Sequence, residues 1–437
     1  MDFLKSLLIV TLLTIIPGQI IRIPQGSPLG AITLTDIAVA SLVLAFLFYS
    51  TAVKKSLKFP NKIFFPFVLF AVWSTSTIIW ALTAFTPHEV ATASLFLARF
   101  VAYFFLSIVV FNLVDKSNIK SWVNLILLSG TLYILTGFVQ LLAIPDLTFL
   151  TPFGWDPHQR RIVGTVIDPN FSGYIFVLIF SLASSYYLFE KKKDGFLIVA
   201  LLSFIALILT FSRSSYLAFI AGAGTIGIIK SPKLLAGIFI VLILTFALIP
   251  QVRTRIIGAL TLDETAQARI ESWQNALVII RDNSLFGVGF NTYRFAQEKY
   301  NFFSLDNPQG GHSGGGVDSS LLLVTATTGA VGISLFILLL GSIIKTIAKD
   351  ASSNPLRLAT LASLFALLVH SLFVNSLFFP QIMLLVFPLL GLCALAGGSR
   401  GRAPNSAQLT HRNQFNVSNH KSTSTGGKET ADRTRFL

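Results

Sequence analysis

Residues Val90–Leu113 read VATASLFLARFVAYFFLSIVVFNL, and Arg99 is the one charged residue among them. A run of about 20 apolar residues is long enough to cross the roughly 30 Å of hydrocarbon in a bilayer as an α-helix. The sequence therefore predicts a transmembrane helix here. Because similar runs recur along the chain, this stretch is typical of the whole fold.

Apolar runs of this kind recur about twelve times. The predicted transmembrane segments are Phe3–Ile21, Ala31–Val53, Ile63–Leu82, Val90–Leu113, Ile119–Ile144, Phe171–Phe189, Phe196–Phe211, Ser215–Ile229, Leu234–Ile249, Val317–Ile344, Leu356–Leu377 and Ile382–Ala396. Hydrophobic residues make up 53% of the 437 residues and charged residues 12%. That is too little charge to cover a soluble protein of this length. We predict an all-α polytopic membrane protein with about twelve transmembrane helices.

The chain is predicted to divide into four parts. Residues 1–249 contain helices one to nine, and residues 317–398 contain helices ten to twelve. Between them, residues 250–316 form one large loop outside the cytoplasm. Residues 399–437 are rich in Ser, Thr, Asn, Gly, Lys and Arg, and this composition is typical of a disordered tail. We expect this basic tail to lie in the cytoplasm.

Lysine sets the orientation of the chain. With the N-terminus inside, lysines such as those of Lys54–Lys62, Lys191–Lys193 and Lys345–Lys349 fall in inner loops, and Lys299 is the one lysine outside. This asymmetry satisfies the positive-inside rule. It predicts a multi-pass protein of the cytoplasmic (inner) membrane with both termini in the cytoplasm.

Arginine collects on the opposite, outer side. The outer arginines include Arg160, Arg161, Arg213 and Arg269. The planar guanidinium binds phosphate or carboxylate in a bidentate way that lysine cannot copy, so an anionic ligand is expected there. Nucleic acid is not expected, although the net charge is +14, because no soluble basic domain is predicted to hold it.

Some of these arginines have simpler interpretations. Arg160 and Arg161 follow Trp155 in a loop before Asp168-Pro169-Asn170, and these turn residues are also what a helix start requires. Arg213 lies in a tight link between two spans, where an arginine can reach lipid phosphates. Otherwise Arg213 points into a cavity beneath the large loop.

The large loop is predicted to contain an amphipathic helix. Thr261–Glu264 fits a capping box, and a stripe with helical spacing follows at Ile270, Trp273, Leu277 and Ile280. Trp273 is expected to pack against the rest of the protein. Because Arg269 lies one turn away, that packing would fix the arginine as well.

Two candidate bases lie near the end of this loop. His312 is flanked by glycines, and Asp318 precedes a long apolar run. Asp318 is expected to cap the following helix, to act as a base, or to do both. No group of side chains suggests a metal site, and no cofactor is expected.

Four pieces of the sequence together resemble the O-antigen ligase and polymerase family of integral membrane glycosyltransferases. They are Arg161–Thr165 with Asp168-Pro169-Asn170, Ser212-Arg213, Arg269 and Trp273 followed by Asn283–Phe290, and Thr328–Ile333. The resemblance covers residues 1–398 and implies a GT-C-like membrane fold. One departure concerns the family's His-Asn pair, which aligns with Asp318-Ser319 in this chain. Either Asp318 replaces the usual base or the glycine loop brings His312 to the same place.

The resemblance implies that a glycan moves from a polyprenyl-diphosphate donor to an acceptor hydroxyl outside the cytoplasm. The acceptor is a glycan, a lipid or a protein, and polysaccharide assembly proteins are further expected partners. Arg160, Arg161, Arg213 and Arg269 would hold the diphosphate, and His312 or Asp318 would take the acceptor proton. Transfer would invert the anomeric carbon and use no metal. Ligation and polymerisation are both open.

Two alternatives compete with an enzyme. An exporter or flippase of polysaccharide or lipid-linked oligosaccharide fits the predicted span count, and a non-catalytic assembly protein fits the arginines. The exporter is disfavoured because the membrane segments contain few ionisable residues, mainly Asp36, Arg99 and His370, and because transporters usually need more of them. No internal repeat suggests two transporter halves.

Overall fold

The computed structural model describes residues 1–23, 31–153, 155–191, 194–302 and 316–397. His312 and the predicted tail at 399–437 lie outside the described residues. Residues Met1–Ala396 form one unit.

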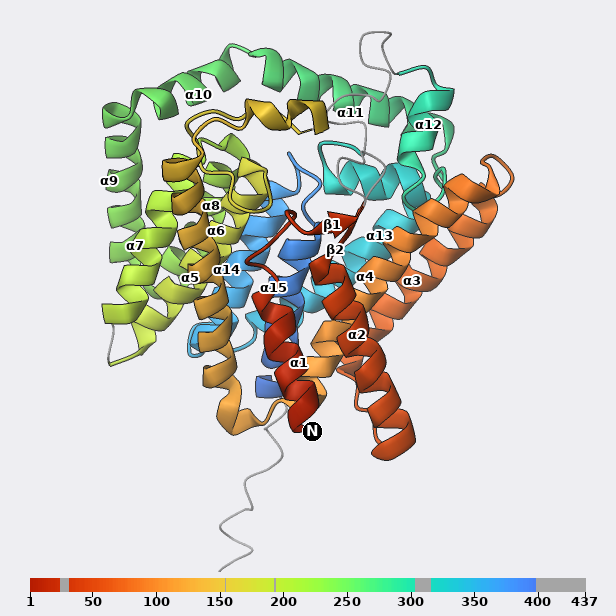
Figure 1. The fold of residues 1–437 in the computed structure, drawn as a ribbon, viewed down its shortest axis with the longest axis horizontal. Helices are drawn as coiled ribbons and strands as arrows, with labels where there is room; N and C mark the ends of the chain where they lie inside the picture. Colours follow the sequence, from red (N-terminus) through yellow and green to blue (C-terminus); the bar gives the residue numbers. More distant parts are fainter. Residues whose placement is uncertain (24–30, 154, 192–193, 303–315, 398–437) are drawn as a thin grey trace, which may run out of the picture. The chain divides into compact units, whose positions relative to one another are not determined.

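This unit is built of helices (Figure 1). They are α1 (Asp2–Leu13), α2 (Leu34–Phe48), α3 (Asn61–Ala81), α4 (Pro87–Leu113), α5 (Ile119–Ala143), α6 (Pro169–Phe189), α7 (Asp194–Leu209), α8 (Arg213–Lys230), α9 (Pro232–Leu248), α10 (Pro250–Leu260), α11 (Glu264–Asp282), α12 (Tyr293–Lys299), α13 (Ser320–Ala348), α14 (Pro355–His370) and α15 (Pro380–Gly397). Strands β1 (Arg22–Ile23) and β2 (Ile32–Thr33) pair antiparallel, with Arg22 opposite Thr33.

Every predicted transmembrane segment overlaps a helix, but α1 ends at Leu13 and α14 at His370, before the predicted ends at Ile21 and Leu377. Within the described residues, seven helices are long and apolar enough to cross a membrane, or eight if α9 and α10, which are bent by 94°, form one span. The remaining predicted segments are helical but shorter or less apolar. The all-helical membrane fold is therefore confirmed, while the count of twelve spans stays a prediction.

The helix ends are fixed by side chains that bind free backbone N–H groups. Thr33 with Asp36, and Thr86 with Glu89, form capping boxes at the starts of α2 and α4. Asp168 caps α6 through two backbone N–H groups, and Pro169 follows it at the first helical position. These sequence signals explain why the spans begin where they do.

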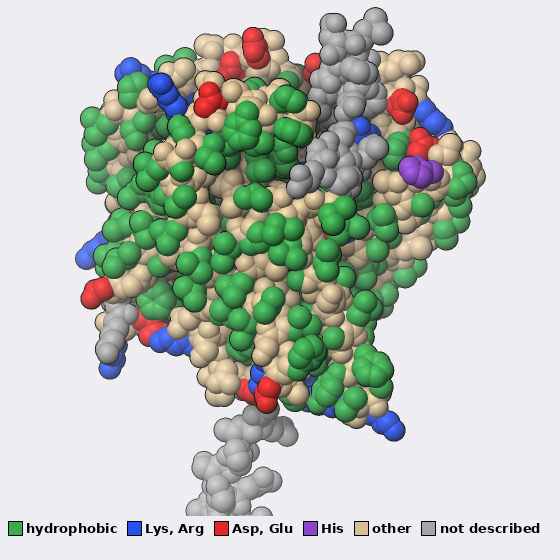
Figure 2. Space-filling model, in the orientation of Figure 1, with side chains coloured by type: hydrophobic (Ala, Val, Ile, Leu, Met, Phe, Trp, Pro, Cys, Tyr) green, Lys and Arg blue, Asp and Glu red, His purple; other side chains and the backbone are tan. Residues whose placement is uncertain are grey.

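The centre of the unit is formed by α6, α14 and α15. Most residues of α6 are buried, and α6 contacts α7, α8 and α14. In contrast, α9 has no buried residue. Figure 2 shows hydrophobic side chains over the middle of one face and charged side chains mainly toward its two ends. This distribution is that of a multi-pass membrane protein.

The segment predicted as a large loop holds α10, α11 and α12. In Figure 1, α10 and α11 run across one end of the helix bundle, at a steep angle to α9. The predicted amphipathic helix is present as α11, which packs on α13, but two details were wrong. Its cap is Asp263 rather than Thr261. Its buried residues are Ser272, Ala276 and Ile279, so the inward face is rotated from the predicted stripe, and Leu277 is 54% exposed.

A break in α13 anchors the end of this loop. Gly329 has φ 67° and lies outside the helical region, which frees carbonyl groups of the preceding turn. The backbone N–H groups of Val288 and Gly289 donate to the carbonyl oxygens of Ala326 and Thr327 at 3.0 Å each. The turn Gly287-Val288-Gly289 is therefore bound through its backbone to the turn of α13 just before the break.

We predict that Gly329→Ala lowers the apparent Tm of the purified protein. A Cβ at Gly329 would collide with the backbone at Leu285, and the positive φ is unfavourable for alanine, so the expected cost is about 1 kcal/mol or more. Gly341→Ala in the same helix is the control, because a Cβ there meets nothing within 4 Å and alanine favours helix. An equal Tm for both variants would contradict the anchoring role of the break.

Candidate active site

Asp168 connects the first and third predicted segments through its charge. Its Oδ1 accepts hydrogen bonds from the backbone N–H groups of Asn170 at 2.7 Å and Phe171 at 3.0 Å, and the residue is 6% exposed. Its charge acts on both Arg161 and Arg269. A buried carboxylate of this kind requires nearby cations and donors, and the two arginines supply the positive charge.

Arg161 is fixed beside this carboxylate. Its Nε donates to the carbonyl oxygen of Thr210 at 2.8 Å. Burial, and then the charge of Arg255, lower the pKa of Arg161 to about 10, while Asp168 acts in the opposite direction. Arg161 therefore remains a cation at neutral pH.

Asn170 links α6 to the start of α8. Its Oδ1 accepts hydrogen bonds from the hydroxyls of Ser212 at 2.7 Å and Ser214 at 3.2 Å, and its backbone oxygen accepts from Ser215 Oγ at 3.1 Å. The Ser214 hydroxyl also lies 3.3 Å from Nε2 of the fully buried His370. Hydrogen bonds thus join the Pro169-Asn170 segment to the segment that begins with Ser212-Arg213.

Arg213 joins this group to the large loop. One of its terminal nitrogens donates to Asp263 Oδ1 at 2.9 Å and Oδ2 at 2.6 Å, and to Thr265 Oγ1 at 2.6 Å. Burial tends to raise the pKa of Asp263, but the bonds from Arg213 and from the α11 backbone outweigh it and hold the pKa below the usual value. Arg213 therefore ties the start of α8 to the start of α11.

Arg269 faces the site from α11. Burial lowers the pKa of its guanidinium, the charge of Asp318 acts most strongly in the opposite direction, and Arg213 adds to the lowering. Asp168 and Asp263 also act on it. Arg269 therefore lies among three carboxylates that belong to three different segments.

Asp318 is held to α11 through its backbone. Trp273 Nε1 donates to the Asp318 carbonyl oxygen at 3.0 Å, and the Asp318 N–H donates to Ser272 Oγ at 3.1 Å. The Trp273 ring lies against Phe373, with centroids 5.9 Å apart. The cap of α13 is Ser319 rather than Asp318, so the expected capping role of the carboxylate was wrong.

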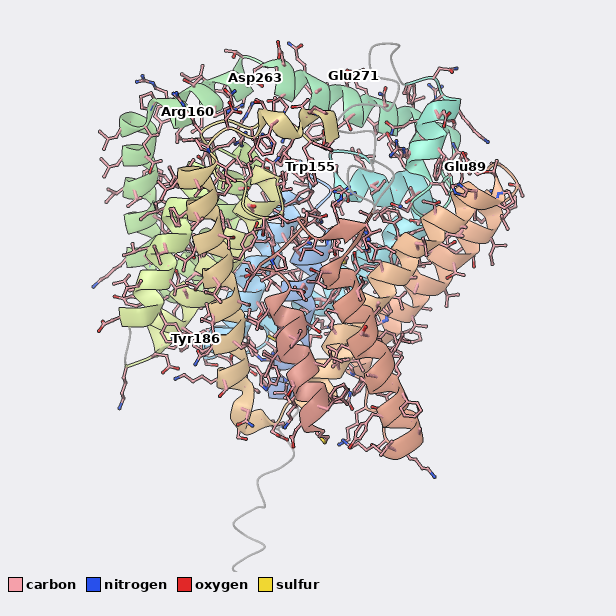
Figure 3. The ribbon with its side chains drawn as sticks, viewed as in Figure 1. Glu89, Trp155, Arg160, Tyr186, Asp263 and Glu271 are labelled. Atoms are coloured by element: carbon pink, nitrogen blue, oxygen red, sulfur yellow. The ribbon has the colours of Figure 1, made fainter. Side chains whose placement is uncertain are left out.

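The structure does not bring every predicted residue into this group. Arg160 is exposed and has a positive φ of 51°; Figure 3 shows it on the segment between α5 and α6. His312 lies outside the described residues. The sequence analysis missed Asp263 as the partner of Arg213, and it missed Asn170 as the link between segments. Both are polar residues at helix starts, which sequence alone assigns to capping.

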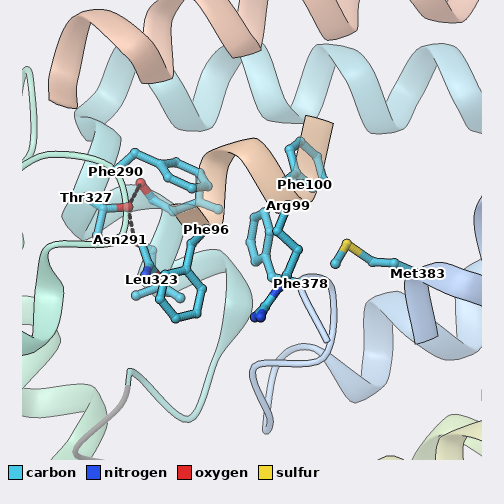
Figure 4. A pocket seen from close by; sticks show the side chains of 10 residues that line it. Phe96, Arg99, Phe100, Phe290, Asn291, Leu323, Thr327, Phe378 and Met383 are labelled. Atoms are coloured by element: carbon cyan, nitrogen blue, oxygen red, sulfur yellow. Dashed lines mark hydrogen bonds between the residues drawn. The ribbon is translucent and has the colours of Figure 1, made fainter. Parts of the chain in front are cut away.

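A separate small cavity lies beside Arg99 (Figure 4). At about 20 Å³ it has room for about one water molecule. The Arg99 guanidinium forms an ion pair with Asp36, with Nε–Oδ1 at 3.0 Å, and also donates to the Ala31 carbonyl oxygen at 2.6 Å. Tyr103 donates to the same carboxylate at 3.0 Å. These bonds hold α2 against α4, so Arg99 has a structural role.

The arrangement suits binding of an anion with several oxygen atoms. Arg161, Arg213 and Arg269 approach the same end of the bundle from three segments, and Asp318 lies beside Arg269. In the part of the chain that the structure describes, no group of three or more His, Cys, Asp or Glu side chains is placed to hold a metal ion. The positive side chains that the structure places at this site are arginines.

The sequence comparison agrees with this geometry. Residues 198–337 match the family model of the O-antigen ligase. The matched region contains Arg213, Arg269, Trp273, Asp318 and the Gly329 break. The resemblance inferred from the motifs is confirmed. A search among curated proteins found no match.

We expect Asp263→Asn to loosen the start of α11. Asparagine caps a helix about as well as aspartate, so the substitution removes the ion pair and leaves the cap. Because the pKa of Asp263 is lowered in the folded protein, the pair is intact above the ordinary carboxyl pKa of about 3.9 and is lost in acid. At neutral pH the native protein therefore has the charged Arg213–Asp263 pair, and the variant lacks it.

Hydrogen exchange of the α11 amides is the measurement. Faster exchange is expected, by about fivefold or less, because a partly exposed pair contributes about 1 kcal/mol or less. Glu264→Gln removes the same charge from the exposed neighbouring residue and should leave exchange unchanged. Equal exchange in the native protein and Asp263→Asn would show that Arg213 does not hold the helix.

Proposed function

We propose that the protein transfers a glycan from a polyprenyl-diphosphate donor to an acceptor hydroxyl at the outer face of the cytoplasmic membrane. One observation carries the proposal: Arg161, Arg213 and Arg269 converge with Asp318 at the end of the bundle covered by α11. The match to the O-antigen ligase family supports a role in membrane glycan transfer.

The placement of charge supports an outer site. Helix α8 begins at Arg213 and ends at Lys230, and Lys5 and Lys120 pair with Asp115 and Glu190. Since lysine-rich ends face the cytoplasm, the arginine end faces outward. Nucleotide sugars are not expected there, so the donor must arrive already activated on a membrane carrier.

The chemistry then follows from the leaving group. The acceptor oxygen attacks the anomeric carbon, the bond from that carbon to the phosphate oxygen breaks, and polyprenyl diphosphate leaves. Direct attack inverts the anomeric carbon. Arg161, Arg213 and Arg269 stabilise the negative charge that develops on the diphosphate. This charge stabilisation takes the place of a metal clamp, so transfer proceeds with chelator present.

The acceptor proton passes to Asp318 or to His312. Trp273 and Ser272 fix the backbone of Asp318, so its carboxylate is held next to Arg269, where the leaving group would lie. The same contacts couple α11 to the site, because moving Trp273 moves both Arg269 and Asp318. Arg160, which is exposed, would contact the donor only from the rim of the site.

Purified protein in liposomes with a polyprenyl-diphosphate oligosaccharide, chelator and no nucleotide sugar is the direct test. A ladder of longer lipid-linked glycans identifies a polymerase, and transfer that requires an added acceptor identifies a ligase. Either product must show the inverted linkage. Movement of the donor across the bilayer with no covalent product would overturn the proposal and favour an exporter.

Single substitutions separate the roles within this assay. Arg269→Gln should lower the transfer rate by about 10²–10³, the loss typical for one charge-stabilising donor. Of Asp318→Asn and His312→Ala, the variant that removes the base should lose about 10²–10⁴. Arg253→Gln, at an exposed residue of the same region, is the control and should keep nearly full activity. Equal activity in all four variants would exclude catalysis at this site.

A further inference from the structure

A large cavity in the described part of the chain lies outside the arginine site. It lies between the end of α1 and the second half of α5, beneath the segment that leads to α6, and its volume is about 760 Å³. Ligand pockets in proteins typically measure about 300–1,000 Å³ and are mostly apolar. The cavity is therefore large enough for a ligand rather than for a few water molecules.

The lining is apolar and opens toward the outside of the bundle. Leu135 and Val139 of α5 line it and are 44% and 62% exposed. Phe149 and Phe153, on the segment above, line it as well and are 57% and 58% exposed. In a membrane protein, such a surface faces lipid tails, so an apolar chain can enter from the bilayer.

One end of the cavity is polar. Arg22 lies there with its guanidinium carbon 4.9 Å from the centroid of the Trp155 ring, and stacking on an aromatic face stabilises a cation. Thr165 also lines the cavity, and its buried Oγ1 has no hydrogen-bond partner. A ligand with an apolar chain and an anionic head would match both ends.

The cavity and the arginine site share one wall. The segment from Arg161 to Ile167 lines the cavity with Gly164, Thr165 and Ile167, while Arg161 donates to Thr210 on the α8 side. Gln140 of α5 fixes this wall by accepting a hydrogen bond from the Val163 N–H at 3.0 Å. A lipid in the cavity therefore lies directly beside the residues that would hold its diphosphate.

We propose that this cavity binds the isoprenoid chain of the lipid-linked glycan. The inference rests on the proposed function, which supplies a diphosphate joined to such a chain. A diphosphate held at the 161–167 segment needs an apolar surface for its tail, and the cavity borders that same segment. Arg22 contributes positive charge on the tail side of that wall.

Photo-crosslinking tests the occupant without requiring transfer. An undecaprenyl diphosphate with a diazirine in its chain is expected to label residues within 16–22 and 132–167, which line the cavity. Val139→Trp and Leu135→Trp each narrow the cavity at its apolar wall and should each lower labelling at least about tenfold. Leu44→Trp is the control, because Leu44 on α2 is 67% exposed and does not line the cavity. A Tm close to that of the native protein shows that a variant is folded.

Three results would overturn the proposal. They are labelling outside residues 16–22 and 132–167, unchanged labelling in both tryptophan variants, or equal competition by excess phosphatidylglycerol, which would indicate a general lipid surface. If the cavity binds the lipid but the proposed function is wrong, the lipid still labels the cavity residues and no glycan is transferred. In an active preparation, Val139→Trp should raise KM for the undecaprenyl donor with little change in kcat.

Discussion

The buried carboxylate of Asp168 is the charge around which one end of this helix bundle is organised. It accepts two backbone N–H groups at the start of α6 and attracts Arg161 and Arg269. A buried charge is tolerated only with such partners. Because Arg161 precedes α6 and Arg269 lies on α11, this requirement brings distant parts of the chain to one place.

The large loop is held over this place by contacts of three kinds. Arg213 and Asp263 form an ion pair at one end of α11, the Trp273 ring nitrogen binds the backbone of Asp318 near its middle, and backbone hydrogen bonds lock the Gly-Val-Gly turn into the break in α13. Each contact uses a residue from a motif that is weak by itself. The motifs become informative together because they meet in space.

Sequence patterns were sufficient to predict where helices form, but not which side chains bind one another. Apolar runs and caps located the spans, and helical spacing found α11, but the inward face was rotated because packing on α13 selects Ser272 and Ala276. The partner of Arg213 could not be found, since Asp263 lies in another segment and its spacing fits a cap equally well. Arg160 and Arg161 are adjacent in sequence, yet only the second turns inward.

The central role proposed for these arginines is to form a diphosphate site. The direct measurement is the affinity of the purified protein for undecaprenyl diphosphate and undecaprenyl monophosphate, compared with a double variant, Arg161→Gln with Arg269→Gln. Charge-assisted hydrogen bonds contribute about 1.5–3 kcal/mol each, so the native protein should prefer the diphosphate by about tenfold or more, and the variant should lose this preference. The same preference in both proteins would contradict the account.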